Sequence, residues 1–185
     1  MKKLTIPTIA AIVIFSAILA TPLHAPVVTV HATPKKSTPP PARRGLRQFL
    51  SKIAYFESEN NPSAVNKYGM LGKYQFHPNT IRVLGYDITD DEFLSDAELQ
   101  DRVMVSYLRA NRKDLRKILA KYTGRQFKGI RISESGVLAA AHFAGSKNVA
   151  RFFENPTDAT GTTDANGASI RLYLVKFANY EIGEI

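Results

Sequence analysis

Apolar residues recur at helical spacing over most of the chain beyond residue 43, and this periodicity restricts the fold more than any other feature. In segment 46–56 the apolar residues fall on one face of a helix. Strand signals are weak and are confined to segments 70–76 and 126–132. The pattern predicts a mainly α (α+β) single domain with at most a small β-hairpin. The other predicted helices are bounded by capping and breaking residues and span 78–84, 95–122, 133–143, 148–154 and 169–180.

Two of these segments carry further information. Segment 95–122 is long enough to contain a break, which we place near Asn111. Segment 133–143 is apolar on all sides, which is typical of a buried helix. The acidic stretch 87–92 lacks the glycine and closing glutamate of a calcium loop, so we interpret it as a turn and helix cap.

The first 32 residues have the pattern of a secretory signal peptide. Lys2 and Lys3 precede an apolar run over 6–20. The stretch 23–32 then offers cleavage sites at small residues, of which we favour the one after Ala32. The alternative is an uncleaved membrane anchor, but the run is shorter than the ~20 residues that span a bilayer, and it contains Pro7. Both interpretations place the rest of the chain outside the cytoplasm, in the periplasm or in the extracellular space.

Residues 33–42 are rich in proline, lysine, serine and threonine, a composition that predicts a semi-stiff spacer. The folded domain is therefore expected to span 43–185. Without Lys2 and Lys3 the formal net charge falls from +9 to +7. In an exported protein this charge favours contact with an anionic cell wall over nucleic acid, although it can also serve solubility alone.

The chain contains no cysteine, which excludes disulfides, thiol nucleophiles and cysteine zinc sites. Beyond the signal only His77 and His142 remain, without the spacing of a zinc hydrolase. We therefore expect no metal, no cofactor, no nucleic-acid partner, no membrane contact after signal cleavage, and a monomer.

Glu57 stands at the C-terminal end of the predicted helix 46–56, just before a turn. A carboxyl at this place can project into a groove, and the aromatic residues expected to line it are Tyr55, Phe56, Tyr74 and Phe76. Partial desolvation raises the pKa of a carboxyl, which lets it act as a general acid on a glycosidic oxygen. These considerations alone do not separate Glu57 from Glu59.

The stretch 57–80 resembles the first signature of the lytic transglycosylases of the soluble-lytic-transglycosylase (goose-type lysozyme-like) superfamily. The residues at matching offsets are Glu57, Ser58, Asn61, Pro62, Ala64, Val65, Gly69, Gly72, Gln75, Pro78 and Thr80. The resemblance implies a lysozyme-like fold, peptidoglycan as substrate and Glu57 as the catalytic acid, with Ser58, Tyr74, Gln75 and Phe76 near the sugar. Lys73 and Tyr74 replace the family's Leu-Met.

A second stretch, 140–145, is similar to the family's Ala-Tyr-Asn-Ala-Gly motif, with His142 at the tyrosine position and Phe143 at the asparagine position. The family uses these side chains to contact sugar and to orient the acid, so His142 and Phe143 are expected to bind substrate. His142 can alternatively be a satisfied helix histidine. Tyr173 resembles the late tyrosine that faces the acid, and plain core packing is its alternative.

Three functions remain open. A lytic transglycosylase cleaves the MurNAc-β-1,4-GlcNAc bond with one carboxylate and leaves a 1,6-anhydro end. A hydrolytic muramidase needs a second carboxylate ~5 to 9.5 Å away, for which Asp164 is the best candidate. A non-catalytic wall-binding or secretion-accessory protein would explain the substitutions at His142 and Phe143. We favour the transglycosylase because the motifs supply one acid.

Overall fold

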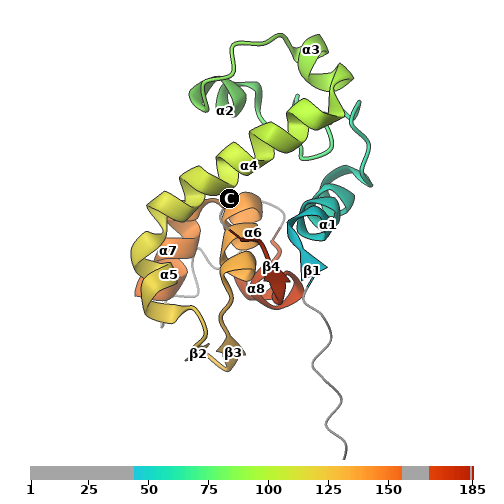
Figure 1. Cartoon of the computed structure of the whole chain (residues 1–185). Helices are drawn as coiled ribbons and strands as arrows, with labels where there is room; N and C mark the ends of the chain where they lie inside the picture. The colour runs from blue at the N-terminus through green and yellow to red at the C-terminus, as the bar shows by residue number, and fades with distance from the viewer. Residues whose placement is uncertain (1–43, 156–166, 184) are drawn as a thin grey trace, which may run out of the picture. The chain divides into compact units, whose positions relative to one another are not determined.

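The long helix α4 (Ala97–Asp114) crosses the molecule, with α2 (Pro78–Val83) and α3 (Asp90–Ser95) beside its first half and α5 (Arg116–Tyr122) and α7 (Ser146–Glu154) at its far end (Figure 1).

The computed structural model describes residues 44–155, 167–183 and 185, all within one compact unit, Pro40–Ile185. The signal peptide 1–32, the spacer 33–42 and Asp164 lie outside the described residues. The remaining elements are β1 (Arg44–Gly45), α1 (Leu46–Ser58), β2 (Gln126–Phe127), β3 (Ile130–Arg131), α6 (Glu134–Ala144), α8 (Ile170–Lys176) and β4 (Tyr180–Glu181).

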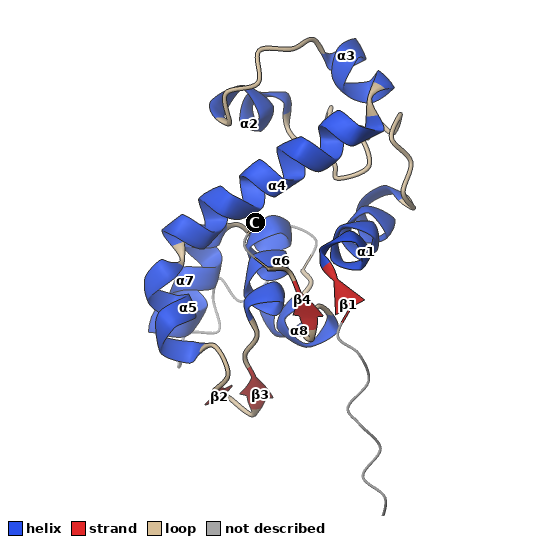
Figure 2. Cartoon of the chain, in the orientation of Figure 1, coloured by secondary structure: helices blue, strands red, loops and turns tan. Residues whose placement is uncertain are grey.

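Helices dominate the described residues, as the periodicity predicted (Figure 2). The strands form two short pairs: β2 and β3 make the expected antiparallel hairpin, and β1 pairs in parallel with β4. The β1–β4 pair was not predicted, because it joins two-residue strands from the two ends of the domain. None of the helices in the described part of the chain is both long and apolar enough to cross a membrane.

Helix α6 is the innermost helix and packs against α8, α7 and α4. Its residues from Ser135 to Ala141 are all buried, which confirms the prediction for segment 133–143. Gly136 allows the close approach of α8, since a Cβ atom there would lie 2.6 Å from the carbonyl oxygen of Leu174. The burial of α6 fixes the position of the histidine in its last turn.

Three local predictions were wrong. Segment 70–76 is not a strand but a series of turns with isolated bridges, because Gly72 and Gln75 have positive φ angles of 70° and 52°. The break in 95–122 falls at Leu115, whose side chain is buried between α4 and α5. Helix α8 ends at Lys176, since Asn179 turns the chain with φ 66° and Tyr180 joins β4.

Helix α1 buries the apolar face that its spacing predicted, with Phe49 and Ile53 fully inaccessible to solvent. It ends because Glu59 and Asn60 adopt left-handed conformations, at φ 54° and 64°. Their backbone N–H groups donate to the carbonyls of Tyr55 and Ala54, at 3.0 and 3.1 Å. This C-terminal cap leaves Glu57 in the last turn of the helix.

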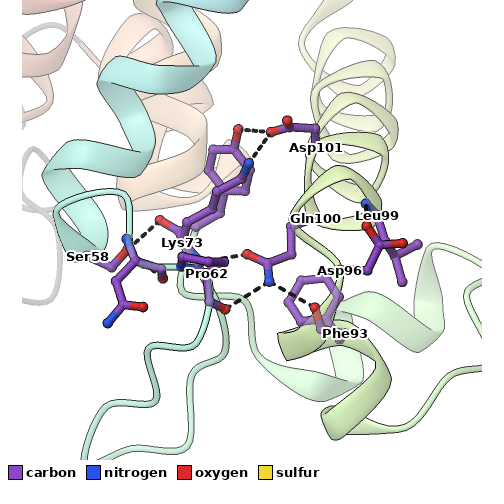
Figure 3. A network of polar contacts seen from close by, with 10 residues as sticks. Ser58, Pro62, Lys73, Phe93, Asp96, Leu99, Gln100 and Asp101 are labelled. Atoms are coloured by element: carbon purple, nitrogen blue, oxygen red, sulfur yellow. Dashed lines mark hydrogen bonds and ion pairs between the residues drawn. The ribbon is translucent and has the colours of Figure 1, made fainter.

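The buried side chain of Gln100, on α4, holds the loop that follows α1 (Figure 3). Its Oε1 accepts the backbone N–H of Lys73 at 2.8 Å, and its Nε2 donates to the carbonyls of Pro62 and Phe93, both at 2.9 Å. Gly72 gives the amide its room, because a Cβ atom there would lie 2.5 Å from Oε1. One amide thus joins loop 59–76 to α3 and α4.

We predict that Gln100→Leu destabilises the protein by about 3 kcal/mol in the free energy of unfolding, measured by chemical denaturation. Leucine fills much of the same space but leaves one N–H and two carbonyls without partners. The matched control is Gln126→Leu at an exposed position of β2, with an expected change below about 0.5 kcal/mol. Equal effects of the two substitutions would contradict the role assigned to the Gln100 amide.

Candidate active site

Glu57 lies in the last turn of α1, and its side chain is 22% exposed. It faces an open surface hollow of about 540 Å³ that is formed by residues 55–59. The next residue, Ser58, fixes the end of the helix: its hydroxyl lies 3.0 Å from the carbonyl of Lys73 and accepts the N–H of Asn61 at 3.2 Å. The side chain of Ser58 therefore positions the end of the helix.

His142, in the last turn of α6, lies next to the side chain of Glu57. Its Nε2 lies 2.9 Å from Oε1 of Glu57, and its side chain is only 5% exposed. Neither ring nitrogen has a hydrogen-bond partner of good geometry among the described residues, so this is a close polar contact and not an aligned hydrogen bond.

Aromatic rings surround the imidazole of His142. The rings of Phe76, Tyr107 and Phe143 have centroids 5.9, 5.8 and 5.1 Å from it, each in an edge-on arrangement. This packing leaves the ring little freedom to turn away from Glu57.

Tyr107, on α4, is a residue of the site that sequence reasoning missed. Burial raises the pKa of its hydroxyl, and the charges of Asp114 and Glu57 raise it further, while Asn111 lowers it. The ring of Tyr107 packs edge-on against the imidazole of His142, which in turn contacts Glu57. No sequence motif marks it, because it resembles any other half-buried aromatic residue of a long helix.

Phe143 and Tyr173 stack on each other, with ring centroids 4.4 Å apart and an angle of 8° between the planes. Phe143 also contacts Phe56, which is 39% exposed at the surface hollow. Tyr173 is 6% exposed, so its ring serves packing in this conformation. Phe143 thus places an aromatic stack beside the imidazole of His142.

Tyr74 and Phe76 do not share a groove with Glu57, and that expectation was wrong. They are 1% and 3% exposed. Tyr74 donates its hydroxyl to Asp101 at 2.5 Å and borders a different pocket, between α1 and α4. Phe76 packs against Phe93 and supports the ring of His142. Both residues are buried in the core and do not reach the surface hollow that Glu57 borders.

Gln75 is half-buried, and its amide donates to the carbonyl of Gly72 at 2.8 Å. That bond stabilises the turn in which Gln75 itself has a positive φ. No group of three or more histidine, cysteine, aspartate or glutamate side chains that could hold a metal ion occurs among the residues that the structure describes.

Comparison with protein families decides the class of the chain. Residues 42–162 match the model of the transglycosylase SLT domain. The chain belongs to this family. The SLT resemblance inferred from the motif at 57–80 is thereby confirmed, and the domain is that of a transglycosylase acting on peptidoglycan. Comparisons with curated proteins and with solved structures find no match.

The Tyr74–Asp101 contact in this SLT domain predicts a loss of stability at alkaline pH. Burial raises the pKa of Tyr74 well above its ordinary value, and the hydrogen bond and charge of Asp101 raise it further. The folded state keeps this proton at a pH where the unfolded chain releases it. The stabilisation is therefore complete below about pH 10 and decreases above it, by about 1.4 kcal/mol per pH unit.

Tyr74→Phe removes this titration, so the difference in unfolding free energy between the wild type and the variant should shrink above about pH 10. Denaturation curves at several pH values measure it. Tyr68→Phe, at a 70% exposed position, is the control and should change stability by less than about 0.5 kcal/mol at neutral pH. A constant difference between wild type and Tyr74→Phe across this range would refute the prediction.

Proposed function

We propose that Glu57 is the acid and base of a lytic transglycosylase that cleaves the MurNAc-β-1,4-GlcNAc bond and leaves a 1,6-anhydro-MurNAc end. The observation that carries this proposal is the position of its partly buried carboxyl, at the end of α1 and 2.9 Å from Nε2 of His142. The carboxyl borders a surface hollow that is open to a polymeric substrate, and it contacts the imidazole of His142.

In the first step the Glu57 carboxyl donates its proton to the bridging oxygen, and the bond from C1 of the muramic acid to that oxygen breaks. The GlcNAc side leaves with a free hydroxyl. The muramic acid's acetamide can stabilise C1 before its own 6-hydroxyl attacks. The proton of that hydroxyl returns to the Glu57 carboxylate, so the reaction consumes no water and regenerates the acid.

This route needs one carboxylate, and among the described residues the hollow that Glu57 borders holds one other, Glu59. Glu59 borders the same hollow, but it follows the helix end on the same stretch of chain. A hydrolytic muramidase would need its second carboxylate across the bond from the first. We therefore favour the transglycosylase, acting as a monomer on wall glycan outside the cytoplasm.

His142 acts in this proposal as a positioning residue. Its imidazole lies 2.9 Å from Oε1 of Glu57, and the aromatic rings around it restrict that geometry. One rotamer of the carboxyl is then favoured, and preorganisation of this kind lowers the barrier to proton transfer.

Glu57→Gln keeps the shape of the side chain and removes the acid, so we expect at least a hundred-fold loss of wall clearing with an unchanged free energy of unfolding. Turbidity of purified cell walls measures the loss. Glu59→Gln is the matched control and should keep most of the activity. Substantial clearing of cell walls by Glu57→Gln would contradict the assignment of Glu57 as the catalytic acid.

The mass of the products decides the chemistry for the wild-type protein. Transglycosylation gives muropeptides that are one water lighter than the hydrolytic products. Hydrolytic masses would establish a muramidase instead. An absence of any clearing by the wild type would favour a non-catalytic wall-binding protein.

The contact with Glu57 predicts different outcomes for two substitutions of His142. His142→Tyr supplies a hydroxyl at the same place and should retain activity within about ten-fold, whereas His142→Leu should lose at least a hundred-fold in kcat with little change in KM. Steady-state kinetics on soluble glycan fragments measures both. Equal activities of the two variants would show that the polar contact is not used.

A further inference from the structure

A dense positive charge covers the surface from the end of α4 to the end of the β2–β3 hairpin. The exposed cations of stretch 113–131 are Lys113, Arg116, Lys117, Lys121, Arg125, Lys128 and Arg131, and Asp114 is its one acid. These seven cations, which we call the basic surface, give the stretch a net charge of +6. The domain 43–185 as a whole has 21 cations and 16 acids, a net charge of +5, so its charge is concentrated here.

The cations of the basic surface have no acidic partners within the described part of the chain, where none of the seven forms an ion pair. Glu134, which follows the hairpin, is already paired with Arg112 at 2.6 Å, and Glu154 ends α7 at an exposed position. Lys117 and Lys121 stand four residues apart on α5, where like charges repel each other. A bound anion would remove this repulsion.

A packed aromatic cluster supports the basic surface. The rings of Tyr122, Phe127 and Phe153 have centroids 4.9 to 5.0 Å apart, and this contact joins α5 to the hairpin and to α7. The ammonium group of Lys121 lies 5.0 Å from the ring centroid of Tyr122, and that of Lys128 lies 5.8 Å from the centroid of Phe127. The cations are therefore carried by a well-packed part of the fold, so a ligand has little backbone to order when it binds.

The basic surface lies away from the proposed acid. The hairpin leads into the first turn of α6, whereas His142, which contacts Glu57, is in the last turn. The helical rise from Glu134 to His142 is about 12 Å. Figure 1 shows the hairpin beyond the start of α6. A ligand on this surface therefore does not have to occupy the site of Glu57.

We infer that the basic surface binds a phosphodiester polymer of the cell envelope, which holds the protein at the wall through a site separate from its substrate site. Each repeat of such a polymer carries a full negative charge. The rise between Lys117 and Lys121 is about 6 Å, so adjacent cations can meet closely spaced charges. Arg125 and Arg131 add guanidinium groups, which form paired hydrogen bonds with phosphate. Release of counterions from the polymer favours binding further.

Three other anionic partners fit this surface less well. A membrane contact buries apolar side chains, and the large exposed apolar side chains of the described residues all lie outside 113–131. Single-stranded nucleic acid is bound by stacking on exposed rings, but Tyr122 and Phe127 are half-buried in their own cluster. The carboxylates of peptidoglycan stems are set apart by the sugars between them, so fewer of them can meet adjacent cations.

The test is a titration of the full-chain protein with soluble poly(glycerol phosphate), with isothermal calorimetry at several salt concentrations. This polymer contains no bond that a transglycosylase cleaves, so the result is independent of the proposed function. Lys121→Glu/Arg125→Glu should weaken binding at least ten-fold. It should also reduce the slope of log Kd against log salt concentration by about 1.4, at about 0.7 for each lost phosphate contact.

The matched control is Lys67→Glu/Arg82→Glu, which makes the same change in net charge at exposed positions beside the first half of α4. Because salt screens distant charges, this variant should weaken binding by less than about two-fold. Equal losses in the two double variants would overturn the inference, since net charge alone would then govern binding. Equal or tighter binding of the wild type to phosphatidylglycerol vesicles, or to soluble glycan fragments with peptide stems, through Lys121 and Arg125 would also overturn it. A wild type that binds the polymer but never cleaves walls would instead contradict the proposed function.

Discussion

The side-chain amide of Gln100 is the interaction on which the rest of the site depends. It satisfies a backbone N–H and two carbonyls that would otherwise be buried without partners, and so it joins the loop after α1 to α3 and α4. The hydroxyl of Ser58 donates a hydrogen bond to the carbonyl oxygen of Lys73 in the same loop. The end of α1, and with it Glu57, is therefore tied to the long helix through the buried amide of Gln100, in addition to the contacts of Lys73 and Tyr74 with Asp101.

The pair Glu57 and His142 shows how a mostly helical fold assembles a site from distant residues. The carboxyl comes from a helix that stops at a left-handed cap, and the imidazole from a helix buried in the core. Because the core is closely packed, the position of His142 is set by Phe76, Tyr107 and Phe143 rather than by its own hydrogen bonds. His142 thus makes a polar contact with the Glu57 carboxyl, and Phe143 adds aromatic packing beside it.

Sequence patterns predicted the helices well and the site only in part. Glu57 and His142 could be named because each stands in a short motif whose spacing survives in the chain. Tyr74 and Phe76 were assigned to a groove because aromatic residues serve equally well in cores and in sugar sites, and only burial separates the two roles. Gln100 and Tyr107 were missed because their importance comes from neighbours far away in the sequence.

The sequence by itself determined the helical class, the buried character of α6 and the family to which the domain belongs, since periodicity and motif spacing are local properties of the chain. Only the tertiary structure decided which polar groups meet: the amide of Gln100 with loop 59–76, and the imidazole of His142 with Glu57. Those contacts depend on the packing of helices separated by tens of residues, which no local pattern records.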